Sequence, residues 1–565
     1  MRLALGQFEG AVRAATDALT SARAAGRIFA RDATFWGGDA ARQTSVGNRL
    51  GWLDVASTMR ARVDELQQFA DGVRASGFTD AVLLGMGGSS LAPEVLRRSF
   101  GPRDGWPRLH VLDTTDPATI HAVLDAIDPA RTLAFVSSKS GTTIEPNCLF
   151  ALFDDLVRKA KGDRAGENFA AITDPGTQLE QLARDHRFRH VFTNPADIGG
   201  RYSALSYFGL APAAVIGIDV AQLLDRGVAE ADAAEAGGDA LQLGAALGAL
   251  ALAGRNKVTF VVAPIVDSFG LWVEQLIAES TGKLGRGIVP VSGEPLGAVE
   301  HYGDDRVFVQ LRIEGATPGE HDAFIGAVTK AGQPVIVIDL SDALDLGREF
   351  FRWEFAIAVA GQVMGINPFD EPNVQESKDN TNRVLREFES SGTLDAAGVD
   401  IGAATLVLDA PGHVANGTLE DALLGLLAKL GTGDYFAITP YVSSSESADA
   451  AFNDMRAAVR DATGAATTLG YGPRFLHSTG QLHKGGPPQG VFLQVTTADE
   501  PDLQIPGRPF TFGQLKRAQA IGDFESLAKH GRPVLRVHLG RDVDAGIAEL
   551  RRAVRVSVGP RAEVR

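Results

Sequence analysis

The sequence predicts an α/β protein built from helix-flanked parallel sheets, and three observations indicate this class. From about residue 80, short apolar runs alternate with helical stretches rich in alanine and leucine. The same alternation begins again at Lys257 and a third time near residue 396. Strands that alternate with helices are typical of parallel sheets covered on both faces. We therefore expect three segments: residues 1–225, which start with extra helices, residues 226–395, and a C-terminal α/β segment, residues 396–565.

The first segment is expected to begin with helices and to continue with five strands. Residues 4–30 and 56–76 have helical patterns. The runs at residues 80–84, 108–112, 132–137, 169–173 and 188–192 are short and apolar, as buried strands are. A long helical region at residues 219–254, interrupted by Gly237-Gly238, leads to the second segment.

The other two segments repeat this pattern. In the second, strands are expected at residues 257–263, 306–313 and 334–340, with a helix at residues 270–280 and a helix after each later strand. In the third, strands are expected near residues 404–408, 433–438, 466–470, 489–495 and 533–538. Helices near residues 418–430, 446–463, 512–527 and 542–553 separate them. The shared pattern raises the suspicion of an internal duplication.

Composition excludes several classes of partner. A chain of 565 residues with a net charge of −16 is not expected to bind nucleic acid. No apolar run is long enough to span a membrane, and the first residues lack the features of a signal peptide. The single cysteine, Cys148, fits a reducing compartment and is most simply a helix-core residue. We therefore expect a cytoplasmic protein with neither membrane nor nucleic-acid partners.

Two turns that follow strands have the composition of a phosphate-binding site. Hydroxyl residues, a lysine and a glycine lie between the strand at 132–137 and the next helix, and a glycine-rich turn, residues 85–90, follows the strand at 80–84. The start of a helix offers free N–H groups and the positive end of its dipole to an anion. The first run alone would also fit an ordinary helix N-cap. The residues expected to hold a phosphate are Gly88, Ser89, Ser138, Lys139, Ser140 and Thr143.

Four motifs together resemble the phosphoglucose isomerase family. In chain order they are the Ser-Lys-Ser-Gly-Thr-Thr run at residues 138–143, Ile198–Ser203 with its Gly-Gly-Arg turn, Gln275–Lys283, and Asn367–Lys378. The resemblance implies two sugar-isomerase (SIS) domains, each a helix-flanked parallel sheet, in a homodimer. It also implies a sugar phosphate as substrate, the interconversion of glucose 6-phosphate and fructose 6-phosphate, and neither metal nor organic cofactor.

The same resemblance implies roles for the site residues. Glu279 would move a proton between two carbons, Arg201 would stabilise the enediolate, and Gln275 would contact the substrate. Lys378 and His301 would open the sugar ring, with His321 as the second choice of histidine. The alternative for Glu279 is a surface residue paired with Lys283 one helical turn later.

The C-terminal segment is longer than in compact members of the family. Residues 472–486 resemble the isomerase half of transaldolase/phosphoglucose isomerase fusions. Since the chain starts at the isomerase half, without room for a transaldolase barrel, no transaldolase activity is expected. The polar loop from His477 to Gly486, which also contains His483, is expected near the mouth of the active site, although a solvated surface turn fits as well. Glu371 and Gln375 stand where many members carry glutamine and glutamate, respectively.

Two other functions remain open at this point. The same enediolate serves both epimers, so a dual-specificity phosphoglucose/phosphomannose isomerase is one alternative. A non-catalytic SIS-domain sensor of phosphosugars is another. Such a sensor would keep the phosphate-binding hydroxyls but would not need Glu279 or Lys378.

Overall fold

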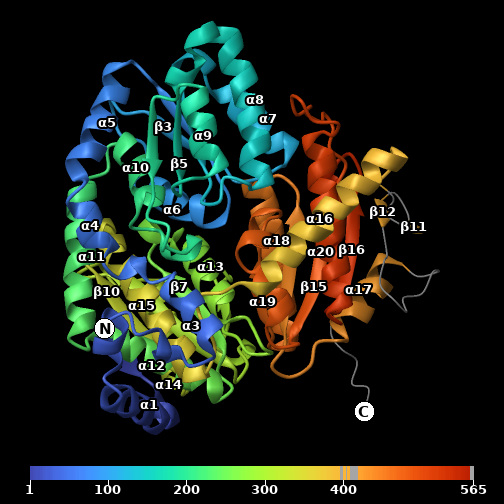
Figure 1. The fold of residues 1–565 in the computed structure, drawn as a ribbon. Coiled ribbons are helices and arrows are strands. Elements are labelled where there is room, and N and C mark those ends of the chain that lie inside the picture. Colours follow the sequence, from blue (N-terminus) through green and yellow to red (C-terminus); the bar gives the residue numbers. More distant parts are fainter. Residues whose placement is uncertain (395–398, 402–403, 407–417, 560–565) are drawn as a thin grey trace.

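The chain folds into three α/β bodies, each built around one sheet. The structure, a computed structural model, describes residues 1–394, 399–401, 404–406 and 418–559. Figure 1 shows the first body (blue to green, top) above the second (green to yellow, bottom left). The third body (orange to red) lies beside both. Helices flank the parallel sheets, and the predicted fold class is confirmed.

The first sheet is entirely parallel, with strands in the order β3-β2-β4-β5-β6. The five predicted strands are all present, as β2 (Asp80–Leu84), β3 (Arg108–Leu112), β4 (Thr132–Ser137), β5 (Phe169–Thr173) and β6 (His190–Thr193). The surrounding helices are α5 (Val63–Ala75), α6 (Leu91–Phe100), α7 (Pro117–Ala126), α8 (Ile144–Lys161), α9 (Gln178–Asp185) and α10 (Tyr207–Val215). The strand order reverses between β2 and β4, and ligands of open α/β sheets bind at such a switch point.

The second sheet has the order β1-β10-β9-β7-β8. Its strands are β7 (Lys257–Val262), β8 (Val289–Val291), β9 (Arg306–Ile313), β10 (Val335–Leu340) and β1 (Arg2–Ala4). Its helices are α11 (Val220–Glu235), α12 (Asp239–Leu252), α13 (Phe269–Thr281), α14 (Glu320–Lys330) and α15 (Leu346–Met364).

Two strands of this sheet were not expected from the sequence. Residues 2–4 form β1, which runs antiparallel to β10, so the predicted helix from residue 4 is wrong at its start; the first α-helices are α1 (Glu9–Ser21) and α2 (Ala24–Phe29). Strand β8 was not predicted either. Both β1 and β8 have only three residues, too few to show a periodicity, and each forms by pairing with a distant strand.

The third sheet is again parallel, with the order β14-β13-β15-β16. Its strands are β13 (Tyr435–Tyr441), β14 (Ala466–Leu469), β15 (Gly490–Thr497) and β16 (Val534–Leu539). Helices α16 (Pro372–Ser391), α17 (Leu419–Leu427), α18 (Glu446–Thr463), α19 (Gly480–Gly485), α20 (Phe512–Lys529) and α21 (Val543–Ser557) belong to this part of the chain. Of the strand predicted at 404–408, Ala404–Leu406 form β12, in a separate antiparallel pair with β11 (Val399–Ile401); residues 407 and 408 lie outside the described residues.

The three sheets share one topology. Counted in chain order, the first four parallel strands of each sheet lie in the spatial order 2-1-3-4. The common order is consistent with the suspected duplication, and each sheet has its own switch point between its first and third strands. The segment boundaries after residues 225 and 395 stay a prediction.

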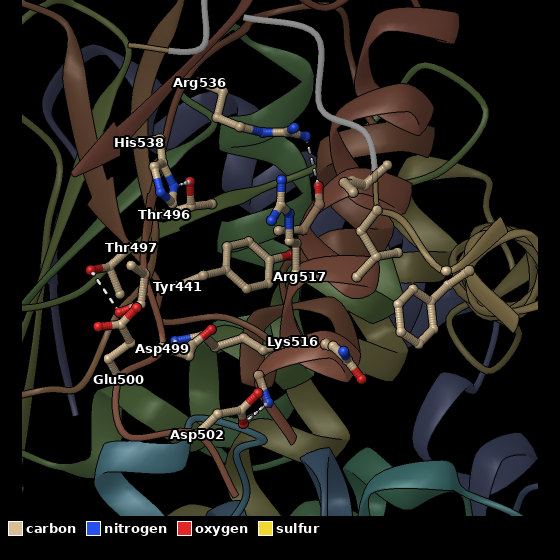
Figure 2. Close-up of a pocket in the computed structure, with 18 residues that line it drawn as sticks. Tyr441, Thr496, Thr497, Asp499, Glu500, Asp502, Lys516, Arg517, Arg536 and His538 are labelled. Carbon is tan, nitrogen blue, oxygen red and sulfur yellow. Dashed lines mark hydrogen bonds and ion pairs between the residues drawn. The ribbon is translucent and has the colours of Figure 1, made fainter. Parts of the chain in front are cut away.

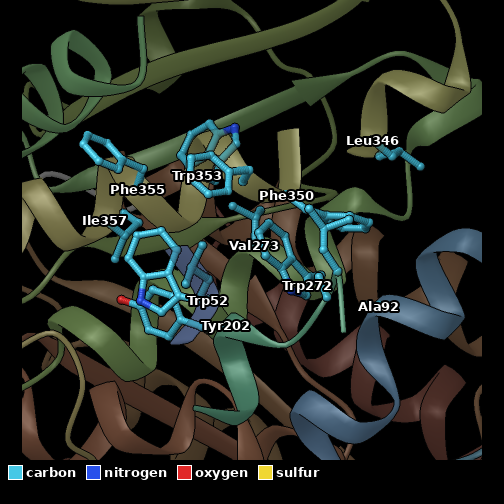
Figure 3. Close-up of a cluster of buried hydrophobic side chains, with 14 of the residues drawn as sticks. Trp52, Ala92, Tyr202, Trp272, Val273, Leu346, Phe350, Trp353, Phe355 and Ile357 are labelled. Atoms are coloured by element: carbon cyan, nitrogen blue, oxygen red, sulfur yellow. The ribbon is translucent and has the colours of Figure 1, made fainter. Parts of the chain in front are cut away.

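An aromatic cluster fixes the elements that carry the central motifs. Trp52 lies 5.3 Å from Tyr202 between ring centroids, and Trp272 of α13 lies 4.8 Å from Phe350 of α15 (Figure 3). These rings are almost completely buried. Because Tyr202 follows Arg201 directly and α13 carries Gln275 and Glu279, this packing holds the arginine turn and the glutamate helix in place.

A buried ion pair attaches the third body to the second. Arg306 of β9 donates to Glu294 at 2.8 Å, and both side chains are fully buried. The same Arg306 donates to the carbonyl of Ala465, while the backbone N–H of Thr467 in β14 donates to Glu294 at 2.8 Å. Removing either charged partner would leave the other buried and unpaired, which is costly. The third body is therefore firmly placed against the second.

Candidate functional site

Close packing of glycines brings turns from different parts of the chain together. A Cβ atom on Gly88 would lie 2.1 Å from the carbonyl oxygen of Gly200, so the glycine turn after β2 touches the arginine turn only because Gly88 has no side chain. Gly87 has a positive φ of 58°, and a Cβ there would lie 2.8 Å from the carbonyl oxygen of His477 in the third body. All three bodies thus contribute to one region of the molecule, since α13 lies against it as well.

Helix α13 presents Gln275 and Glu279, one turn apart, to this region. The Gln275 amide donates to the carbonyl of His477 at 2.6 Å. Arg201 Nη1 lies 3.4 Å from Glu279 Oε1, whereas Glu279 Oε2 is buried and has no hydrogen-bond partner among the described residues. Burial raises the pKa of Glu279 to about 7, against the pull of the Arg201 cation and with a contribution from Glu371. A carboxylate with such a pKa can both take and return a proton near neutrality.

The Arg201 guanidinium is held on several sides. It donates to Ser280 at 2.8 Å, to the carbonyl of Pro368 at 2.8 Å and to Glu371 Oε2 at 2.9 Å. Burial by itself would raise the pKa of Glu371, but Arg201 holds it below its usual value. Lys283 does not pair with Glu279; its ammonium lies 2.7 Å from Asp370 Oδ1, and burial lowers the pKa of Lys283 to about 8.

The hydroxyl run after β4 forms a compact turn at the start of α8. Ser138 donates to Thr143 at 3.2 Å and accepts from the backbone N–H of Gly141 at 3.1 Å. Thr143 precedes the first residue of α8 but makes no capping hydrogen bond with its side chain. The first N–H groups of this helix therefore have no cap from that residue, as an anion site requires. Lys139 turns to Asp174 and to the carbonyl of Ala196 instead.

A cavity of about 230 Å³, which we call the phosphate-loop cavity, opens in front of this turn. Residues 142–145 line it on one side, and Lys378 lines it from α16. Leu476, His477 and Gln519 complete the wall from the third body. The cavity thus brings Thr143, Lys378 and His477 together, and Gln275 contacts the carbonyl of His477 from α13.

The imidazole of His477 is fixed by a buried carboxylate. His477 Nε2 lies 3.0 Å from Glu145 Oε1, and Gln519 donates to the same oxygen at 2.6 Å. Burial opposes the charge of Glu145, but His477 holds the pKa of this carboxyl below its usual value. Glu145 and Gln519 were not predicted as site residues from the sequence. Glu145 follows the hydroxyl run, but the residues that bind it come from the distant third body.

The structure does not bring the other candidate histidines to this site. His301 Nδ1 lies 3.0 Å from Asp461 of α18. His321 is the second residue of α14, in the second body. His483 is buried, with its ring 4.9 Å from that of Phe492. The predicted loop at residues 477–486 is largely helical, because Gly480–Gly485 form α19, and of its two imidazoles only that of His477 lines the phosphate-loop cavity.

The described part of the chain holds neither a cluster of metal-ligating side chains nor a membrane-spanning helix. Within it, no group of three or more histidine, cysteine, aspartate or glutamate side chains could hold a metal ion. No helix in the same residues is both long and apolar enough to cross a bilayer.

Comparison with known proteins places this arrangement in a family. A family profile described as "Phosphoglucose isomerase" matches residues 50–284. The glucose-6-phosphate isomerase of Rubrobacter xylanophilus is 33% identical over 371 residues, which cover 56% of this chain and 85% of that protein. That of Heliobacterium modesticaldum is 30% identical over 393 residues, covering 60% and 88%, respectively. The chain belongs to the phosphoglucose isomerase family.

The fold of a solved structure is consistent with this membership. A hypothetical protein from Thermus thermophilus superimposes with a TM-score of 0.59 and 25% identity. The superposition covers 68% of this chain and 99% of that protein. A substantial part of this phosphoglucose isomerase family member therefore lies outside the region that superimposes on that structure.

The contact between Arg201 and Glu371 leads to a prediction on pH. In this member of the phosphoglucose isomerase family, the Glu371 charge helps to raise the pKa of Glu279, which would need to be ionised to serve as a base. Replacing Glu371 with glutamine removes that charge, so the pKa of Glu279 falls and activity persists to lower pH. We expect the acidic limb of the kcat/KM profile to move down from about pH 7. A limb that stays in place or moves up would contradict the coupling; Glu376→Gln, at a carboxylate paired with His530, is the control.

Proposed function

We propose that the protein interconverts glucose 6-phosphate and fructose 6-phosphate through an enediolate. The observation that carries the proposal is the buried pair of Arg201 and Glu279, whose second carboxylate oxygen has no partner in the described part of the chain. Burial, which raises the pKa of this carboxyl to about 7, suits a base that shuttles one proton between C1 and C2. The two relatives described above carry the name of this activity.

In this proposal, the phosphate binds at the start of α8. Ser138, Ser140 and Thr143 supply hydroxyl donors there, with the N–H groups of the first helical turn and Ser89 of the neighbouring turn. Lys139 contributes charge from a second layer, because Asp174 and the Ala196 carbonyl hold its ammonium group. The sugar carbons then point toward α13, where Arg201 stabilises the negative charge that develops on the enediolate oxygens.

Ring opening is assigned to His477 instead of His301. An imidazole held by a buried carboxylate keeps one orientation and one tautomer, as a general acid–base group must. Glu145 gives His477 this support, and the ring faces the phosphate-loop cavity together with Lys378. Lys378, which lines the same cavity, remains the second group proposed to open the sugar ring.

A coupled spectrophotometric assay of the purified protein tests this function. Fructose 6-phosphate should be converted to glucose 6-phosphate, whereas unphosphorylated fructose should be a very poor substrate because it lacks the group that the α8 turn binds. Mannose 6-phosphate, offered in the same assay, tests the dual-specificity alternative. Comparable kcat/KM values for fructose and fructose 6-phosphate would contradict the phosphate-binding role of residues 138–143.

The remaining expectations extend the proposal to the whole protein. A homodimer follows from the family resemblance and a cytoplasmic location from the composition of the chain, and both stay predictions. Light scattering coupled to size-exclusion chromatography measures the first of these directly.

A further inference from the structure

A second and larger cavity lies in the third body, away from the residues discussed so far. Its volume is about 590 Å³, within the range of small-molecule sites. We call it the third-sheet cavity; Figure 2 shows the side chains around it. Its walls come from β13, from β15 and the loop that follows, from β16, from α20 and from the end of α16. Among the described residues, none lines both this cavity and the phosphate-loop cavity.

The position of the cavity is the one where ligands bind in sheets of this topology. Tyr441 is the last residue of β13, and Thr496 and Thr497 end β15. These two strands are neighbours across the point where the strand order reverses. In the first sheet, the equivalent point between β2 and β4 is where the glycine turn and the hydroxyl turn meet. The third sheet therefore offers a second crevice of the same kind.

One wall of the cavity is rich in positive charge. Arg517 of α20 is exposed and makes no ion pair or hydrogen bond with any residue in the described ranges. Arg536 of β16 also lines the cavity, where it donates to Gln494 at 2.7 Å and to the carbonyl of Ala520 at 3.2 Å. His538 lines the same cavity, and burial, followed by the charges of Arg517 and Arg536, lowers its pKa. An anion at this wall would meet the guanidinium group of Arg517, and such groups bind phosphates and carboxylates well.

A buried hydroxyl on the same side lacks a partner. The side chain of Tyr441 is fully buried and lines the cavity, yet its hydroxyl has no hydrogen-bond partner among the described residues. Figure 2 shows it between the strand side of the cavity and Arg517. Buried polar groups without a partner are rare and costly in folded proteins. A ligand oxygen in the cavity would satisfy this donor.

The opposite wall carries three acidic side chains, each already supported by donors. Asp499 pairs with Lys516, Glu500 lies 3.2 Å from Arg541, and Asp502 accepts from the backbone N–H of Gly513 at 2.8 Å. A carboxylate has several acceptor sites, so these groups can still receive hydrogen bonds from hydroxyl groups. They would repel a second anionic group but accept the hydroxyls of a polyol.

We propose that the third-sheet cavity is a binding site for a small anionic polyol, distinct from the isomerase site. Its phosphate or carboxylate contacts Arg517, Tyr441 and His538, and its hydroxyl groups donate to the acidic wall. Helix α20 supplies both cavities, with Gln519 facing the phosphate loop and Arg517 facing the polyol.

Equilibrium binding of sorbitol 6-phosphate, which combines a single phosphate with hydroxyl groups, tests the proposal on the full chain. We expect two equivalents per chain, one that competes with fructose 6-phosphate and one that does not. Gluconate and sorbitol then distinguish the recognised group: the first carries a carboxylate in place of the phosphate, and the second carries no anionic group. Sorbitol alone should not occupy the second site.

Two substitutions assign the second equivalent to the cavity. Tyr441→Phe keeps the ring and removes the hydroxyl, and Arg517→Ala removes the charge; each should weaken the non-competing equivalent by about tenfold or more. Arg386→Ala is the matched control, because Arg386 is an exposed arginine of α16 outside the cavity. All three variants should keep the isomerase kcat/KM, which shows that they are folded.

A single equivalent in the unmodified protein, or a second one that neither Tyr441→Phe nor Arg517→Ala weakens, would overturn the proposal. Loss of the competing equivalent would instead count against the proposed isomerase function.

Discussion

Replacing Glu279 with glutamine is expected to lower kcat for fructose 6-phosphate by about 10²–10⁴-fold. Glutamine keeps the shape of the side chain but cannot take a proton, so only the transfer between C1 and C2 is lost. The phosphate turn and Arg201 are unchanged, and binding of a phosphorylated aldonate should therefore persist. Steady-state kinetics and calorimetric titration measure the two effects separately.

Glu274→Gln is the matched control for this experiment. Glu274 lies on the same helix and is half-buried, with burial raising its pKa to about 8, and its carboxyl accepts from the backbone N–H of Ser292. At neutral pH it is therefore already largely uncharged, and glutamine imitates that form. Turnover of Glu274→Gln should stay close to that of the unmodified protein.

A Glu279→Gln variant that keeps more than a hundredth of the original kcat would exclude Glu279 as the base.

Replacing His477 with alanine is expected to impair ring opening and to spare the later proton transfer. On fructose 6-phosphate, which is mostly cyclic, kcat/KM should fall by about 10²-fold or more. On 5-deoxyfructose 6-phosphate, which cannot close its ring, the loss should be much smaller. The physical reason is that Glu279 and Arg201 act on the open chain, whereas the imidazole held by Glu145 acts on the ring oxygen or anomeric hydroxyl.

The same pair of substrates separates His477 from His301. His301→Ala removes an imidazole that contacts Asp461 outside the phosphate-loop cavity, so it should affect neither substrate strongly. Glu145→Gln should follow the pattern of His477→Ala in a milder form. Equal losses on cyclic and acyclic substrates in His477→Ala would show that this histidine is structural. A selective loss in His301→Ala would return the role to the residue expected from the sequence.

Much of the fold and part of the site could be predicted because their signals are local. Strands β2, β4 and β5 are unbroken apolar runs, and the hydroxyl run after β4 directly precedes α8. Gln275 and Glu279 lie one turn apart on one helix, so their shared face follows from helical geometry. The three-residue strands β1 and β8 were missed, because their only support comes from pairing with residues far away in the sequence.

The sequence by itself therefore determined the α/β class, the hydroxyl-rich turn before α8 and the helix that carries Gln275 and Glu279, since each depends on residues that are neighbours in the chain. Only the tertiary structure decided which histidine faces the site. His477 reaches Glu145 across 332 positions and Gln275 across 202, through contacts created when the third body packs against the first two. Other tertiary contacts, within the first body and around the third sheet, turned Lys139 toward Asp174 and left Tyr441 beside a cavity. Such contacts depend on how whole sheets and helices fit together, which no local pattern of residues encodes.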